Sequence, residues 1–415
     1  MKVFKFGGAS LKTAAGIRNV ASIIEAHKGN KLLVIVSAMG KTTDMLERVL
    51  NLSASHQDFG QTLTSLKNYH HEVVDQLFTN AISVTAEVNA VFANLEEQLT
   101  KEADFDQVYD QVVSLGEVLS SIIVHHYLLS RNVTSQWIDA RKFIHTDNTF
   151  REGKVDWSTT AEKIQPLKSI LSDNIIITQG FIGCTPEGYT TTLGREGSDF
   201  SAAIFASSLQ DESVTIWKDV PGVMNADPRR FPNAEVFAEL PFKEAAEMTY
   251  YGASVIHPKT IKPLANKGIP LLVKNFDDPK LPGTIIHECI VENLPPLIVL
   301  KENQCLISCK VTDYTFISEE QLGNIFNALH ELNVRINVMQ NSAISFSFCI
   351  DFRESKITKL IEKLQRNFEV YYNTGLTLIT VKNYDEETSD VYRKLPGVLL
   401  EQLSRSTLQV LVRKF

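Results

Sequence analysis

The sequence predicts an α/β fold with an open, mainly parallel sheet sandwiched by helices, followed by a smaller α+β domain. In the first part, strand-like runs alternate with helical ones, a pattern that needs crossover helices and gives parallel strands. After residue 296 the order becomes strand–helix–strand–strand–helix–strand, the split arrangement of ferredoxin-like domains. At roughly 150 residues per domain, a chain of 415 residues is long enough for both parts.

The first 55 residues contain two expected strands, each followed by a loop and a helix. Residues 2–6 alternate between apolar and other side chains and end at Gly7-Gly8. Residues 31–37 contain the run LLVIV, which is typical of a strand buried on both faces.

Residues 57–130 differ from this pattern, and we interpret them as a helical subdomain. Apolar side chains recur at helical spacing, and glycine and proline are nearly absent. The stretch carries eleven Asp and Glu but only two lysines, Lys67 and Lys101.

Sheet-like sequence then resumes. Polar, glycine-rich residues at 180–199 are expected to form a loop, and the proline-rich stretch 279–296 a linker. The expected strands are 134–138, 175–178, 214–217 and 270–274, and the expected helices are 158–171, the small-residue run from Ser198, and 242–251.

The C-terminal part is expected to hold one complete ferredoxin-like domain, residues 296–373, and a fragment. In the complete domain the expected strands are 305–311, 334–338, 343–352 and 368–372, and the helices are 318–332 and 355–367. Residues 374–415 add a strand at 377–381, a short helix at 398–403 and a strand at 407–412, too few for a second copy.

Composition and charge argue against several classes of protein. A net charge of −8 is unfavourable for a general nucleic-acid binder. No apolar run approaches the ~20 residues of a membrane span, and the N-terminal sequence MKVFKF has no leader character, so we expect a cytoplasmic protein. The five cysteines form no CxxC pair and the paired histidines are sequence neighbours, so no metal site is expected.

Three polar, glycine-containing segments follow expected strands, where ligands gather in open parallel sheets. The first is KFGGAS, residues 5–10, whose glycines let backbone N–H groups approach an anion beside the charge of Lys5. Taken alone, two glycines after a strand more often form only a tight turn. The spacing matches neither a Walker A loop nor a GxGxxG fingerprint.

The second segment is TLGREGSD, residues 192–199, which opens the small-residue helix. Helix capping explains Ser198 or Asp199 but leaves Arg195 and both glycines unexplained, so carboxylate or phosphate capture is favoured. The third segment, WKDVPGVMNADPR at 217–229, carries charges of both signs, and an ordinary surface loop would explain it equally well.

Taken together and in order, six blocks resemble aspartate kinases, enzymes with the amino-acid-kinase fold. The blocks are KFGGAS, VSAMGKTTD, SLGE, TLGREGSD, WKDVPGVMNADPR and YGASVIHP, between residue 2 and about residue 275. The resemblance implies transfer of the ATP γ-phosphoryl group to the β-carboxylate of L-aspartate, giving 4-phospho-L-aspartate and ADP on the route to lysine, threonine and methionine. It also implies a kinase domain over residues 1–295.

The resemblance implies that Lys5 neutralises charge on the transferred phosphoryl group and that Asp199 orients this lysine. Gly7, Gly8 and Ser10 would shape the phosphate loop.

For the acceptor, the resemblance implies that Arg195 and Ser198 bind aspartate, Arg195 through a bidentate carboxylate contact. Glu117 would pair with the substrate ammonium, and Ser37 and Thr43 would line the same pocket. As an isolated residue, Glu117 is better explained as a solvated helix carboxylate, because most glutamates are exposed.

Lys218, Asp219, Met224 and Arg229 fall on nucleotide-contacting positions of the family. Mg²⁺ would arrive with ATP, held mainly by phosphate oxygens and without dedicated protein ligands.

Four residues depart from the family's usual pattern. Ala9 stands in place of Ser or Thr, Glu196 in place of Gly, Met224 in place of Tyr and Ser254 in place of Lys. Because Lys5, Arg195 and Asp199 are present, catalysis is still expected.

The C-terminal part resembles an ACT-type regulatory region, which implies a homodimer formed through it. Lysine-sensitive relatives carry a Gly-Phe and an Asp where this chain has Tyr314-Thr315-Phe316 and Asn337. A bound lysine would lose a charged hydrogen bond worth about 1.5–3 kcal/mol. We therefore expect lysine inhibition to be weak or absent.

Two other functions remain open from the sequence. One is another enzyme of the same fold, acting on glutamate, acetylglutamate or a nucleotide. Another is a non-catalytic amino-acid sensor. A bifunctional kinase–homoserine dehydrogenase is not expected, because no dinucleotide-binding domain follows the kinase-like part.

Overall fold

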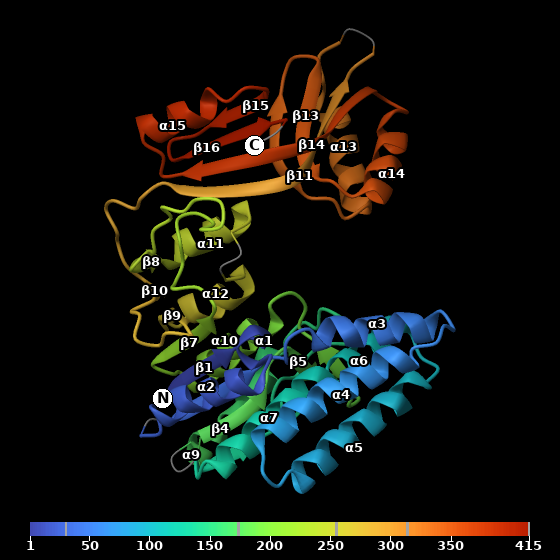
Figure 1. Cartoon of the computed structure of the whole chain (residues 1–415). Coiled ribbons are helices and arrows are strands. Elements are labelled where there is room, and N and C mark those ends of the chain that lie inside the picture. The colour runs from blue at the N-terminus through green and yellow to red at the C-terminus, as the bar shows by residue number, and fades with distance from the viewer. Residues whose placement is uncertain (30, 172–174, 254–255, 313–314, 414–415) are drawn as a thin grey trace. The chain divides into compact units, whose positions relative to one another are not determined.

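The computed structural model describes residues 1–29, 31–171, 175–253, 256–312 and 315–413, which form two compact units (Figure 1). The first unit comprises residues 1–223, 236–249 and 254–291. The second comprises residues 292–415 and two short segments, 224–235 and 250–253, that interrupt the first unit in the sequence.

An eight-stranded sheet forms the centre of the first unit, in the order β3-β4-β2-β1-β7-β9-β10-β8. Every neighbouring pair is parallel except β9 with β10, which confirms the predicted mainly parallel sheet. The strands are β1 (Lys2–Phe6), β2 (Leu32–Val36), β3 (Ser135–Trp137), β4 (Ile175–Gln179), β7 (Ser213–Lys218), β8 (Glu239–Pro241), β9 (Leu271–Asn275) and β10 (Thr284–His287).

Helices cover both faces of this sheet because its central strands are apolar on both. All five residues of β2 are buried. Phe4 and Phe6 of β1 join the core formed with α2 and α7, whereas α10 packs on β1 and β2 and brings its Asp199 to Lys5. The helices outside the subdomain are α1 (Gly8–Leu11), α2 (Ala14–Glu25), α3 (Thr42–Ala54), α8 (Trp157–Ile164), α9 (Leu167–Ile170), α10 (Gly197–Leu209), α11 (Phe242–Tyr251) and α12 (Pro258–Ala265).

The helices expected between residues 57 and 130 are present. They are α4 (Gly60–Leu77), α5 (Ile82–Leu99), α6 (Phe105–Val113) and α7 (Leu115–Ser130). By length and composition alone, the stretch Phe105–Ser130 could cross a membrane. In the structure, however, 83% of its most apolar part is buried, as in a core helix.

Three predictions for the first unit need correction. The helix expected at 158–171 is two helices, α8 and α9, with Pro166 between them, because proline lacks the N–H that a continuous helix needs. The loop expected at 180–199 contains the hairpin of β5 (Ile182–Cys184) and β6 (Thr190–Thr192). The expected linker 279–296 contains β10, whose Thr-Ile-Ile run is favourable in strands.

The second unit contains a six-stranded sheet in the order β12-β13-β11-β14-β16-β15. The order β11-α13-β12-β13-α14-β14 confirms the predicted ferredoxin-like arrangement. The elements are β11 (Leu297–Lys310), α13 (Glu319–Glu331), β12 (Ile336–Asn341), β13 (Ser345–Asp351), α14 (Glu354–Leu364), β14 (Glu369–Lys382), α15 (Glu386–Arg393), β15 (Val398–Leu403) and β16 (Thr407–Val412).

Two long strands, β11 and β14, run through both halves of this sheet. The first residues of β11, Leu297–Lys301, pair with the end of β14, which pairs in turn with β16. The C-terminal fragment is therefore larger than residues 374–415 alone, because it shares β11. The helix expected at 398–403 is wrong: these residues form β15 against β16, and the helix lies earlier, at α15. A short apolar run such as VLLEQL does not by itself distinguish the two conformations.

We expect Gly180 to be essential for seating α10 against the sheet. A Cβ atom at this position would lie 2.5 Å from the Cβ of buried Ser198. Gly180→Ala should therefore lower the free energy of unfolding by about 1–3 kcal/mol, measured by urea denaturation. Gly29→Ala is the matched control, since its added Cβ would meet nothing within 4 Å. Equal unfolding midpoints for the two variants would contradict the packing argument.

Candidate active site

A pocket of about 550 Å³ opens at the carboxyl ends of the parallel strands in the first unit. Lys5 lies at the end of β1, Lys218 at the end of β7, and Ser37 directly after β2. The lining residues are Lys5, Ser37, Thr43, Glu47, Tyr109, Glu117, Arg151, Phe181, Thr192, Gly194, Arg195, Glu196, Gly197, Ser198, Asp199 and Lys218.

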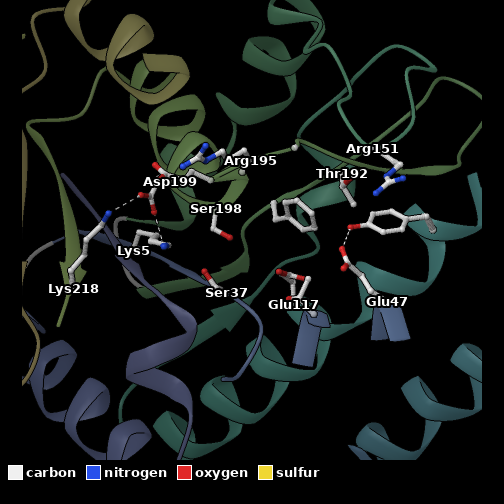
Figure 2. Close-up of a pocket in the computed structure, with 16 residues that line it drawn as sticks. Lys5, Ser37, Glu47, Glu117, Arg151, Thr192, Arg195, Ser198, Asp199 and Lys218 are labelled. Atoms are coloured by element: carbon white, nitrogen blue, oxygen red, sulfur yellow. Dashed lines mark hydrogen bonds and ion pairs between the residues drawn. The ribbon is translucent and has the colours of Figure 1, made fainter. Parts of the chain in front are cut away.

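The pocket brings together eight residues that the sequence singled out. Figure 2 shows Lys5, Asp199 and Lys218 toward one end, Glu47 and Arg151 toward the other, and polar side chains between them. The eight are Lys5, Ser37, Thr43, Glu117, Arg195, Ser198, Asp199 and Lys218.

Asp199 lies between two ammonium groups. Its carboxylate is 2.6 Å from Lys5 Nζ and 3.9 Å from Lys218 Nζ, and its side chain is only 3% exposed. Burial by itself would raise the pKa of Asp199, but the two lysines hold it below its ordinary value. Two cations meet one anion here, so this end of the pocket keeps a net positive charge that can stabilise a second anion.

The start of α10 places Asp199 and Ser198 in the pocket. Glu196, the residue before the helix, has a left-handed backbone with φ +53°, a conformation that costs a non-glycine residue about 1–2 kcal/mol. Its carboxylate accepts a hydrogen bond of 2.8 Å from the backbone N–H of His257. The unexpected glutamate is therefore tied to the start of α12, and glycine would suit the same backbone.

Glu117 is a buried carboxylate that faces the pocket from α7. Its Oε1 accepts a 3.4 Å hydrogen bond from the Ala38 N–H, and its Oε2 has no partner among the described residues. Burial raises the pKa of Glu117 to about 8. A cationic ligand would supply the missing partner, and the solvated helix carboxylate considered from sequence is excluded by this burial.

Arg195 and Ser198 lie on the loop and first turn that open α10. Arg195 is exposed, and within the described part of the chain its guanidinium makes no hydrogen bond or ion pair. Ser198 is buried, and Figure 2 shows its hydroxyl between Lys5 and Glu117. Both side chains can therefore serve a ligand rather than the fold.

Sequence reasoning missed the far wall of the pocket. There Tyr109 donates a hydrogen bond to Glu47, and the Arg151 guanidinium lies 4.2 Å from the centre of the Tyr109 ring. Buried Asp110 fixes this wall by accepting hydrogen bonds from the backbone N–H of Arg151 and of Thr192, at 2.9 and 2.8 Å. No motif marks Glu47, Tyr109 or Arg151, because these three come from separate stretches of sequence.

Several predicted residues lie outside the lining. Gly7 precedes the short helix α1 and lies beside the Lys5 ammonium, and the buried Ser10 hydroxyl donates to the Gly7 carbonyl at 2.7 Å. Gly8 packs against the backbone of Ala38, where a Cβ would lie 2.6 Å from the carbonyl oxygen. The Ser10 hydroxyl therefore stabilises the start of α1.

The other residues predicted to contact the nucleotide do not line the pocket. Asp219 follows Lys218 and is exposed. Met224 and Arg229 belong to the second compact unit, where Arg229 pairs with Asp227 at 2.7 Å. Ser254 lies outside the described residues.

Comparisons with known proteins find relatives along almost the whole chain. Residues 1–275 match the amino acid kinase family. Lysine-sensitive aspartokinase 3 of Escherichia coli is 31% identical over 96% of this chain and 90% of that protein. Aspartokinase 1 of Arabidopsis thaliana, a chloroplastic protein, is 30% identical over 96% of this chain and 73% of its own length. The crystal structure of E. coli aspartokinase III with aspartate and ADP superposes with a TM-score of 0.84, at 27% identity, over 99% of this chain and 96% of that one.

Glu117 should make the stability of the protein depend on pH. Its pKa is about 8 in the folded state against 4.5 for the free group, so the folded state binds an extra proton between these values. Stability from this residue is therefore lost as the pH rises from about 5 to about 8. Relative to Glu117→Gln, the wild-type free energy of unfolding should fall across that window, measured by urea denaturation at a series of pH values. A pH-independent difference between the two proteins would contradict the raised pKa.

Proposed function

The chain belongs to the amino acid kinase family, and within that family we propose that it is an aspartate kinase. The proposed reaction transfers the γ-phosphoryl group of ATP to the β-carboxylate of L-aspartate and gives 4-phospho-L-aspartate and ADP. Its product would enter the biosynthesis of lysine, threonine and methionine.

The arrangement of charges in the pocket is the observation that carries this proposal. Lys5 and Lys218 supply positive charge at one end of the pocket. Among the residues that the structure describes, one oxygen of Glu117 has no partner and the Arg195 guanidinium makes no ion pair. Aspartate has one ammonium and two carboxylates, so Glu117 suits the ammonium and Arg195 a carboxylate. The cationic end then suits the phosphoryl group.

Catalysis in this site depends on charge neutralisation and positioning. The acceptor carboxylate is already ionised, so no general base is needed, and the main barrier is the approach of two anions. Lys5 would neutralise the transferred phosphoryl group, and Asp199 would hold the Lys5 ammonium in place. Lys218 and the first-turn N–H groups of α10 would add to the positive field.

ATP would bind with Mg²⁺ coordinated mainly by phosphate oxygens. The donor set agrees with this, because Asp199 is engaged by two ammonium groups instead of standing with other carboxylates. When bound, Mg²⁺ would neutralise phosphate charge. Contacts from Asp219, Met224 and Arg229 to the nucleotide, and phosphate-loop roles for Gly7, Gly8 and Ser10, are part of this proposal.

We further propose a catalytic domain at 1–295 and an ACT-type regulatory region at 296–415 that forms a homodimer. A cytoplasmic location is also proposed. All five cysteines are unpaired, as is usual for proteins of a reducing compartment.

Asn337 supports the expectation of weak lysine inhibition. Its Oδ1 accepts a 2.9 Å hydrogen bond from Lys301, and its amide donates to Gln304 at 2.7 Å and to Asp351 at 2.9 Å. The chain's own ammonium therefore already occupies the acceptor that a bound lysine would need, and an amide offers no compensating charge.

Replacing Lys5 should abolish most of the activity. We expect Lys5→Met to lower kcat by about 100-fold or more, the usual effect of removing one group that stabilises developing charge, in an aspartate hydroxamate assay with ATP and Mg²⁺. Lys2→Met, on the same strand but away from the pocket, is the matched control and should keep wild-type kcat. Aspartate binding without turnover by the wild type would refute the kinase proposal and favour the non-catalytic sensor.

Lysine should inhibit the kinase poorly. In the same assay, lysine up to millimolar concentration should leave the rate nearly unchanged, because Asn337 cannot replace a carboxylate. Asn337→Asp should increase sensitivity to lysine if this side chain limits binding. Submillimolar inhibition of the wild type would contradict the expectation.

A further inference from the structure

A cluster of three different donor side chains lies in the first unit, outside the candidate active site. Glu239 comes from β8, His287 from the end of β10, and Cys289 follows β10 by two residues. None of the three lines the active-site pocket. The sequence led us to expect no metal site, because it contains no CxxC pair and its paired histidines are sequence neighbours.

The pairing of β8 with β10 places two of the three side chains on one face of the sheet edge. The strands are parallel, with Ile285 opposite Glu239 and Ile286 opposite Leu240. Ile286 and Leu240 are both buried. Since side chains alternate between faces, Glu239 and His287 share the other face. Cys289 lies after a bend that follows β10, and this bend brings its sulfur close to both.

The donor atoms of the cluster are close together. One oxygen of Glu239, a ring nitrogen of His287 and the sulfur of Cys289 all lie within 4.8 Å of one another. His287 Nε2 contacts Glu239 Oε1, and the Cys289 sulfur lies within reach of both. Ligand atoms around a tetrahedral Zn²⁺ are roughly 3.5 Å apart, so small side-chain rotations would suffice to close the group around an ion.

The chemistry of the donors selects the metal. Imidazole and thiolate favour Zn²⁺ and its neighbours over Mg²⁺ and Ca²⁺, which prefer oxygen ligands. One carboxylate and one thiolate balance the charge of a divalent ion, and three protein ligands leave a fourth position for water. His287 and Glu239 are 31% and 47% exposed, so an ion can reach them from solvent.

We propose that Glu239, His287 and Cys289 bind one Zn²⁺ ion that fastens the edge strand β8 to the segment after β10. Glu239 is brought to the other two ligands only when β8 and β10 pair, so the ion binds the folded unit in preference to the unfolded chain. Binding of that kind stabilises the fold. The site is separate from the proposed kinase active site, and the proposal does not depend on kinase activity.

Cobalt substitution tests the site directly in the full-length protein. After removal of metals with EDTA, Co²⁺ should bind at one equivalent per chain, with a thiolate-to-cobalt charge-transfer band and the visible bands of four-coordinate Co²⁺. Addition of Zn²⁺ should bleach both. Absence of the charge-transfer band in the wild type would overturn the proposal.

Variants identify the ligands. Cys289→Ser should abolish the charge-transfer band, and His287→Ala and Glu239→Gln should weaken Co²⁺ binding at least about tenfold. Cys184→Ser is the matched control, because Cys184 is also a half-buried free thiol of the first unit and should leave the band intact. A band that survives in Cys289→Ser, or that disappears in Cys184→Ser, would assign the metal elsewhere and refute the site.

A thermal measurement provides a readout independent of spectroscopy and of kinase activity. Zn²⁺ added to the metal-free protein should raise the Tm of the wild type and of Cys184→Ser but leave that of Cys289→Ser unchanged. The metal-free proteins should melt at similar temperatures, which would show that the variants fold. An equal Zn²⁺ response in all three proteins would contradict the proposal.

Discussion

The buried ion pair between Asp199 and Lys5 is the interaction on which the site depends. It joins α10 to the end of the central strand β1, with Lys218 of the neighbouring strand β7 on the other oxygen of the carboxylate. Loss of one partner from such a pair leaves an uncompensated charge and typically costs about 3–5 kcal/mol. With two lysines the pair keeps an excess of positive charge. The same contact therefore fixes the helix and prepares the pocket for an anion.

The rest of the site is arranged around that contact by close backbone packing. Gly180 lets α10 approach the end of β4, and the left-handed residue Glu196 turns the chain into the helix. The helical subdomain supplies side chains from the opposite side of the pocket. Glu117 on α7 lines the pocket, and Asp110 on α6 accepts a hydrogen bond that holds the loop of Arg151. Residues 57–130 carry eleven acids and two lysines, whereas the remainder of the chain is nearly neutral. An acidic protein thus keeps a cationic end in its pocket because most of the negative charge belongs to another region.

In the C-terminal unit, strand pairing joins residues on both sides of the boundary that the sequence predicts at residue 374. By sequence position, only residues 374–415 are left for a second ferredoxin-like half. In the structure, Leu297–Lys301 of β11 also belong to this half, because they pair with the end of β14. The same unit places Lys301 against Asn337, a contact between residues that no sequence motif connects. At the edge of the other sheet, the parallel pairing of β8 and β10 gathers Glu239, His287 and Cys289 in a similar way.

The sequence by itself determined the parts of this protein that depend on local pattern. The buried run of β2, the helices of residues 57–130 and the ferredoxin-like order follow from hydrophobic periodicity, and the motif loops placed Lys5, Arg195 and Asp199 at strand or helix ends. Only the tertiary structure decided what depends on contacts between distant segments. It showed that Val398–Leu403 is a strand, because its partner β16 supplies the hydrogen bonds, and that Glu47, Tyr109 and Arg151 form the far wall of the pocket. Periodicity reports which face of an element is apolar, but not which other element will meet that face.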